Sequence, residues 1–292
     1  MTTTLRTRHG VTLVELLMAM IIAAVLGSAL MSLMMSMSRF EEREEGLRSA
    51  RRAARSAINT LVSEMRMVDP EWGVESASAT SVTVRVPYAM GLVCSSTLVL
   101  HTVMLFPVDS VALAQPGLSG FASRGTGGAM APFTAGLTLA FSGSIPVACT
   151  SAGIQSIAAP ASAPNAGSRP VTIAGVGMPI LPPGTPVMLY RRVRYYFGAS
   201  ATAGITGRTA LWRHYLDAGT GPTELAGPFD PAAAFRFYSL GATTAQTAVP
   251  ALADIRGLEF YLPGESDRTA RKRGDFEQAD LTTSVFFVNR RN

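Results

Sequence analysis

The chain has 292 residues, a formal net charge of +5 and charged side chains at only 15% of its positions. So small a net charge argues against nucleic acid as the principal partner, and the low share of charge is typical of an exported, membrane-tethered chain. The length allows one or two domains.

The first predicted element is a long apolar run, from Val11 to about Met37, whose only charged side chain is Glu15. About 20 apolar residues cross a bilayer as a helix, so the run predicts a transmembrane helix over residues 11–37. A carboxylate inside such a helix costs about 2.5 to 3.5 kcal/mol. We therefore expect Glu15 to have a partner that offsets this cost.

Two simpler interpretations of the run leave something unexplained. A secretory signal peptide has an apolar region of about 7 to 15 residues with a cleavage site after it, whereas this run is longer and follows Gly10. A plain signal anchor fits the length, with Arg6 and Arg8 on the cytoplasmic side, but gives Glu15 no partner. Cleavage between Gly10 and Val11 supplies one. The new ammonium group of Val11 attracts the carboxylate, within one chain or between neighbouring copies in a staggered bundle.

The stretch GVTLVEL at residues 10–16, behind a short basic leader, resembles the processing site of type IV prepilins and pseudopilins. The resemblance implies a leader over residues 1–10, cleavage after Gly10 by a prepilin peptidase, and N-methylation of Val11. Phe or Met is more usual at that first mature position, but the peptidase reads chiefly the preceding Gly. The resemblance also implies that Glu15 acts in assembly with other pilins or pseudopilins through the N-terminal helix.

An amphipathic helix is predicted to continue over residues 38–69 and to end at Asp69-Pro70. Its apolar side chains recur at steps of three, four and seven: Phe40, Leu47, Ala50, Ala54, Ala57, Leu61, Met65 and Val68. Its charges are segregated, acids first: Glu41, Glu42, Glu44 and Glu45, then Arg48, Arg51, Arg52 and Arg55. They fit a solvated face with local pairs such as Glu44 to Arg48, or pairing between staggered neighbours in a filament.

From residue 70 onward, strand-like runs are broken by Gly and Pro. Strands are predicted within residues 81–90, 96–106, 137–141, 185–200, 208–217, 233–241, 253–264 and 279–292. Residues 116–170 are rich in Gly, Ala, Ser and Pro and are predicted to form variable loops. A long helix followed only by strands predicts an α+β fold, in which an antiparallel sheet of one extracytoplasmic domain, residues 70–292, packs on the helix.

The C-terminal part is similar to the larger minor pilins of the PilW and PulJ kind, on the motifs VRYYF, LWRHY, IRGLEFYL and TSVFFVNRRN. The similarity implies a subunit that helps initiate or cap a type IV pilus-like filament. The alternatives are a minor pseudopilin of a type II secretion system, or an adhesin or other ligand-binding module carried at a filament tip. Each implies an inner-membrane origin, with the C-terminal domain outside the cytoplasm, and contact with an inner-membrane assembly platform. Residues 71–180 match no family pattern.

The two cysteines, Cys94 and Cys149, each lie beside a predicted strand. Disulfides persist outside the cytoplasm, so we expect a bridge, which closes a loop of about 55 residues. The alternative is two unpaired buried thiols.

Catalytic and metal-binding motifs are missing from the sequence. There is no HExxH, GxSxG or P-loop pattern, and once His9 is lost with the leader, His101 and His214 are far apart. We therefore predict neither an enzyme nor a bound cofactor or metal. The GTGG cluster at residues 125–128 is interpreted as a flexible loop. The basic run Arg268, Arg271, Lys272 and Arg273, flanked by acids, is interpreted as a solvated hairpin loop.

Overall fold

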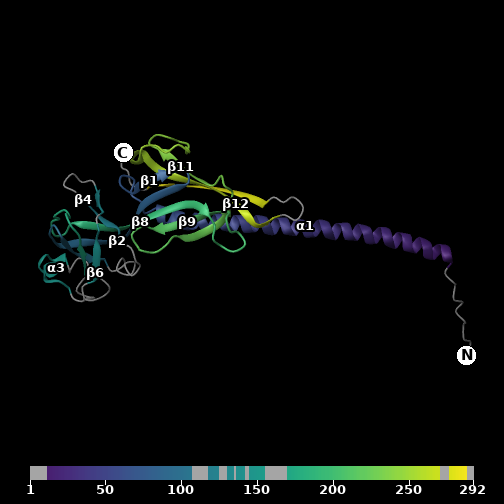
Figure 1. The fold of residues 1–292 in the computed structure, drawn as a ribbon, viewed down its shortest axis with the longest axis horizontal. Coiled ribbons are helices and arrows are strands. Elements are labelled where there is room, and N and C mark those ends of the chain that lie inside the picture. Colours follow the sequence, from purple (N-terminus) through teal and green to yellow (C-terminus); the bar gives the residue numbers. More distant parts are fainter. Residues whose placement is uncertain are drawn as a thin grey trace, which may run out of the picture.

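The structure is a computed structural model that describes residues 12–106, 118–124, 130–134, 136–141, 145–154, 170–269 and 276–287. A single long helix, α1 (Leu13–Met65), projects from a β-rich body, and its first residues lie at the end far from that body (Figure 1). The described strands pair antiparallel throughout and form one sheet. This architecture confirms the predicted α+β fold, with an antiparallel sheet packed on the N-terminal helix.

The strands, in chain order, are β1 (Val74–Ser78), β2 (Ser81–Ser96), β3 (Leu100–Leu105), β4 (Gly120–Arg124), β5 (Met130–Phe133), β6 (Thr138–Phe141), β7 (Pro170–Ala174), β8 (Pro186–Ala199), β9 (Thr209–Tyr215), β10 (Thr223–Phe229), β11 (Ala234–Ser239), β12 (Ile255–Thr269) and β13 (Phe276–Phe286). Two short helical turns accompany them, α3 (Val147–Ser151) and η1 (Leu252–Asp254). The main path of the sheet runs β11-β12-β10-β9-β8-β2-β3-β7-β6, with β1 beside β2, β13 beside β12, and β4 between β8 and β5.

Helix α1 uses its two halves differently. Every side chain from residue 12 to residue 40 is exposed, whereas the second half buries a stripe of small and apolar residues, namely Ala50, Ala54, Ala57, Leu61 and Met65. The steps of three and four between them keep the stripe on one face of the helix, as the sequence predicts. The packed stripe is shorter than predicted, because Phe40 is 64% exposed and lies ahead of the sheet.

The helix also ends earlier than predicted, at Met65 rather than at Asp69-Pro70. The backbone N–H of Met67 donates to the carbonyl of Glu64, and that of Val68 donates to Met65. These hydrogen bonds join residues three apart, as in a 3-10 helix, and so tighten the last turn. The α-helical pattern therefore ends before the proline.

Two buried clusters divide the body along the length of β2 and β8. The proximal core lies between α1 and the sheet and includes Leu61, Val84, Phe235 and Phe260. The distal core contains no residue of α1 and includes Val93, Val103, Phe121, Ile173 and Leu189. Figure 1 places β6 and α3 at the end of the molecule opposite the free end of α1. We call the part built on the distal core, the described residues between positions 87 and 190, the distal lobe.

Each of the eight predicted strand ranges overlaps a strand of the structure, but five further strands lie outside the predicted ranges: β1, β4, β5, β7 and β10. Two of these, β4 and β5, lie inside residues 116–170, where the sequence predicts variable loops and a single strand at residues 137–141. Both are four or five residues long, and β4 is held by pairing with β8 on one side and β5 on the other. The GTGG cluster lies outside the described residues.

Candidate assembly site and its attachment to the body

The N-terminus of α1 is closed by a reciprocal pair of side chains. The backbone N–H and the hydroxyl of Thr12 each donate to Oε2 of Glu15 at 3.0 Å, and the backbone N–H of Glu15 donates to Oγ1 of Thr12 at 3.4 Å. This is a capping box, which satisfies N–H groups that have no partner within the helix. Glu15 therefore has an intramolecular partner that the sequence prediction did not name. The predicted cleavage site, Gly10 and Val11, lies outside the described residues.

The capping box could have been read from the sequence, because Thr12 and Glu15 stand in the T-x-x-E spacing directly before an apolar run. It also suits the charge of Glu15, since the N-terminal end of a helix carries a partial positive charge. The carboxylate is thus oriented toward the N-terminal end of the helix, where it accepts both hydrogen bonds from Thr12.

The first half of α1 presents an apolar surface to its surroundings. Its exposed large side chains include Leu13, Leu17, Ile21, Leu26 and Leu33, and no neighbouring element of the described chain covers them. The helix is long and apolar enough to cross a membrane. Such a surface needs either a bilayer or other apolar helices around it.

The β12–β13 hairpin is fastened to α1 where the helix leaves the body. Ser49 donates its hydroxyl to Oδ1 of Asp267 at 2.6 Å, and Nε of Arg43 lies 3.5 Å from Oε2 of Glu277. The hydrogen bond from Ser49 is the main reason that the pKa of Asp267 lies below its ordinary value. The predicted local pair between Glu44 and Arg48 is not among the ion pairs of the described residues, and the ion pair of this part of the helix with the hairpin comes from Arg43.

The other end of the helix is held by a partly buried charge. Glu64 accepts a hydrogen bond from Nη1 of Arg213 at 2.8 Å and another from the hydroxyl of Tyr195. Burial raises the pKa of Glu64 above its ordinary value, and the charge of Arg213 opposes that effect. Glu64 and Arg213 are 149 residues apart in the chain, so no local sequence pattern predicts this contact.

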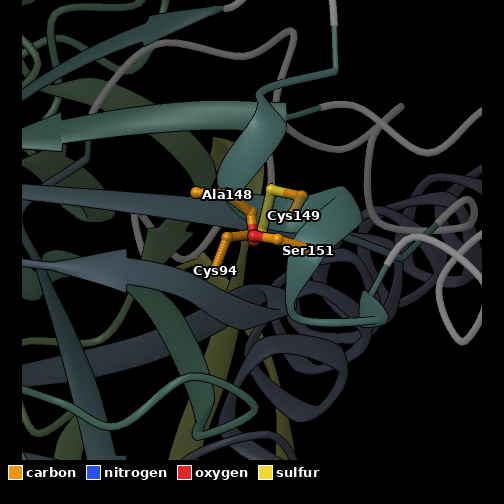
Figure 2. The surroundings of a disulfide bond; sticks show 4 residues. All are labelled: Cys94, Ala148, Cys149 and Ser151. Carbon is orange, nitrogen blue, oxygen red and sulfur yellow. A yellow bond between two sulfur atoms is a disulfide. The ribbon is translucent and has the colours of Figure 1, made fainter.

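The cysteines form a disulfide that belongs to the distal lobe. Cys94 of β2 and Cys149 of α3 are bonded, with their Cα atoms 4.6 Å apart (Figure 2). In the same turn, Ser151 donates its hydroxyl to the carbonyl of Ala148 at 3.2 Å. The bridge lies with Met104 and Ile154 in a small buried cluster. It fixes α3 on the face of β2 and β3, and the sequence prediction paired the same two residues.

The remaining candidates for chemistry do not come together. His101 is buried on β3 against the ring of Phe121, whereas His214 lies on β9 opposite Arg194. Among the described residues no group of three His, Cys, Asp or Glu side chains is arranged to hold a metal ion. Of the basic run, only Arg268 lies within the described residues, at the end of β12.

Comparison with known proteins finds one similarity. A family model for the prokaryotic N-terminal methylation motif matches residues 5–31. Neither the curated proteins nor the solved structures give a match. The matched segment contains the predicted cleavage site, the capping box of Thr12 and Glu15, and much of the exposed apolar surface of α1.

Proposed function

We propose that this chain, which carries the N-terminal methylation motif of the type IV prepilin and pseudopilin family, is a minor pilin-like subunit that helps to initiate or cap a filament. The observation that carries the proposal is the combination of that motif with a 53-residue helix. The exposed apolar half of the helix can pass from a bilayer into a bundle of similar helices. The other half of the helix packs on the β-domain and holds that domain outside the bilayer or bundle.

In this proposal a prepilin peptidase removes residues 1–10 and methylates the amino group of Val11. The new ammonium group then lies one residue before Thr12, at the same helix end as the carboxylate of Glu15. Within a subunit, Glu15 remains the cap of its own helix. Between staggered subunits, it attracts the amino group of a neighbouring pilin or pseudopilin and fixes the register of the two helices.

The proposed location is the inner membrane, with residues 11–37 as the anchor and residues 70–292 outside the cytoplasm, followed by entry into an extracytoplasmic filament through the assembly platform. The disulfide supports this orientation, because disulfides persist outside the cytoplasm. Residues 38–69 form the amphipathic connection. The proposed role is structural rather than enzymatic, in line with the pilin motif.

A second proposal is that the filament carries the chain as a binding module. The distal lobe favours it, because that lobe has a core of its own and lies at the end of the molecule away from α1 (Figure 1). The choice between a pilus and a type II secretion system depends on the partner subunits. The genes that neighbour the coding sequence discriminate between these systems.

Mass spectrometry of the N-terminal peptide tests processing. We expect the native chain to begin at N-methylated Val11, and we expect Gly10→Val to remain uncleaved because the residue before the scissile bond must be small. Gly27→Ala is the matched control, since a methyl group at Gly27 meets no other atom within 4 Å. An intact Met1 in the native chain, or cleavage elsewhere, contradicts the proposal.

Filament counts test the assembly role. Deleting the gene should lower the number of filaments without changing the amount of the major pilin in the membrane, and the wild-type gene should restore them. A deletion that leaves filament number unchanged, but abolishes attachment of cells to a surface, favours the binding module instead.

A further inference from the structure

The distal lobe is almost free of charge. The chain has 25 basic and 20 acidic side chains, and only three of them fall within positions 87–190 of the sequence: Asp109, Arg124 and Arg169, of which the structure describes Arg124. A surface lobe normally carries charged side chains of both signs at about a quarter or more of its positions. This lobe therefore offers no electrostatic attraction to nucleic acid, acidic polysaccharide or anionic lipid.

The outer end of the lobe instead exposes four aliphatic side chains on two adjoining turns. Leu98 and Val99 lie in the turn between β2 and β3 and are 58% and 56% exposed. Val176 and Ile180 lie in the connection between β7 and β8 and are 83% and 65% exposed. We call these four side chains the apolar tip. Because exposed aliphatic side chains gathered at one place mark an interaction site more often than single ones do, the apolar tip requires an explanation.

The two turns are joined by backbone hydrogen bonds. The N–H of Gly175 donates to the carbonyl of Val99, and the N–H of Met178 donates to the carbonyl of Leu98, each at 3.0 Å. The apolar tip is thus one unit built from two segments, rather than four side chains on independent loops.

The polar groups beneath the tip are also paired within the protein. Thr97 donates its N–H to the carbonyl of Leu100 at 2.8 Å, and the N–H of Leu100 donates to Oγ1 of Thr97 at 3.0 Å. The hydroxyl of Ser96 accepts the N–H of Leu181 at 2.8 Å. These bonds satisfy several backbone groups of the two turns within the protein, which lowers the cost of moving the tip out of water, since a bilayer offers backbone groups no partners.

The tip is held rigidly from below. Cys94, two residues before Ser96, is bonded to Cys149, and β3 and β7 continue from the two turns into the distal core. A pre-formed tip binds without the cost of ordering a loop.

We propose that the apolar tip inserts into the surface of a lipid bilayer with uncharged, zwitterionic headgroups, at the end of the molecule opposite the membrane helix. Four side chains on two turns form too small a contact for the roughly 800 Å² that each partner buries in a stable protein complex, whereas insertion requires no partner surface of matching shape. The shortage of charge suits insertion, because a charged side chain in hydrocarbon costs far more than an aliphatic one gains. This inference does not rest on incorporation into a filament.

The test uses the full chain with α1 embedded in a lipid nanodisc, which leaves the tip free, mixed with separate phosphatidylcholine vesicles that are then floated. We expect the wild type to float with the vesicles equally well at about 0.1 M and about 1 M salt, because no charge attraction is involved. Val176→Glu and Ile180→Glu should each reduce the bound fraction at least about tenfold, because they place a carboxylate at the insertion depth.

Leu240→Glu is the matched control. Leu240 is 64% exposed but follows β11, whose core residues belong to the proximal core, so this variant should float as the wild type does. Unchanged thermal melting of each variant shows that the fold is intact. Equal flotation of wild type and Val176→Glu overturns the proposal, as does binding confined to vesicles that contain phosphatidylglycerol. It is also overturned if the tip variants leave flotation unchanged but reduce co-purification of other pilins, which assigns the tip to a protein contact.

Discussion

Gly264 of β12 lies directly against the backbone carbonyl of Ala50 in helix α1. A Cβ atom added at Gly264 would overlap the carbonyl oxygen of Ala50, and backbone atoms of a packed helix cannot move aside as the end of a flexible side chain can. Ala50 has no exposed surface and begins the buried stripe of the helix. Helix and strand can approach this closely because Gly264 has no side chain and Ala50 has only a methyl group.

The first prediction concerns this contact. Gly264→Ala should lower the free energy of unfolding by about 1 to 3 kcal/mol, because overpacking forces helix and strand apart. Gly46→Ala is the matched control: its added methyl group would lie 3.4 Å from its nearest neighbours, at ordinary contact distance. Since Gly costs about 1 kcal/mol against Ala within a helix, Gly46→Ala should be neutral or stabilising. Thermal unfolding of both variants measures the difference, and equal melting temperatures would contradict the interpretation.

The second prediction separates the two roles of Glu15. Glu15→Ala should leave cleavage after Gly10 intact but reduce co-purification of partner pilins, because both the helix cap and the negative charge are lost. Glu15→Asp should be partly tolerated, because it keeps the charge and shortens its reach. Thr12→Ala is the control, since it breaks the capping box while keeping the carboxylate of Glu15.

Loss of the cap alone costs about 0.5 to 2 kcal/mol of helix stability. If pairing between subunits dominates, Thr12→Ala retains its partner pilins and Glu15→Ala does not. If both variants lose them equally, capping is the function of Glu15. Equal recovery with the wild type and Glu15→Ala excludes both roles in assembly.

A third prediction concerns pH. Both ring nitrogens of His101 are buried without a hydrogen-bond partner, and burial lowers its pKa below the ordinary value of 6.5. The folded state therefore binds fewer protons than the unfolded state, so stability rises with pH in the window below about 6.5. We expect the wild type to lose stability as the pH falls from about 7.5 to about 5, and His101→Leu to lose less. No charged group is among the causes of the shift, so the loss should not depend on salt.

Hydrogen exchange can locate this effect. Amides of β3 and β7 should exchange faster at low pH than expected from the intrinsic rate, whereas those of β11 and β12 should not, because His101 pairs with Ser96 and Ile173 in the distal lobe. An identical pH dependence of stability in the wild type and His101→Leu would show that another group titrates.

The disulfide gives a fourth prediction. Non-reducing peptide mapping should recover a linked pair of Cys94 and Cys149. Replacing both with Ser should cost about 4 kcal/mol in the loop-entropy model, since the closed loop spans 55 residues. The loss should appear as protease sensitivity of the distal lobe, with the proximal core still folded. Two alkylatable thiols in freshly isolated, unreduced protein would refute the pairing.

What the sequence predicted well follows from local patterns. The buried stripe from Ala50 to Met65 was predicted because small and apolar residues recur at helical spacing, and β8, β9 and β12 were predicted from their aromatic and β-branched runs. The capping box of Thr12 and Glu15 also follows from a local pattern, the T-x-x-E spacing. The cost of a carboxylate in a membrane does not by itself indicate this partner.

What the sequence could not predict depends on contacts between distant residues. Strands β4 and β5 are short segments, GFASR and MAPF, with little strand preference, and they are held by their pairing with β8 and with each other. The contact of Glu64 with Arg213, and the close approach of Gly264 to Ala50, arise only when the sheet has packed on the helix. Helical spacing identifies the buried face of α1, but says nothing of which strand meets it.

The division into two cores has a mechanical consequence. Among the described residues, α1 packs on the body through the stripe from Ala50 to Met65 and side chains near it such as Arg43, Ser49 and Glu64, and it contributes no residue to the distal core. A pulling force on the free end of α1 therefore enters the body through the proximal core. The buried stripe is about 22 Å long, so the force is distributed over all of its packing contacts. These contacts must break together before the helix separates from the sheet. The distal lobe beyond it bears no tension. Its shape at the far end of the molecule is therefore preserved when α1 is pulled.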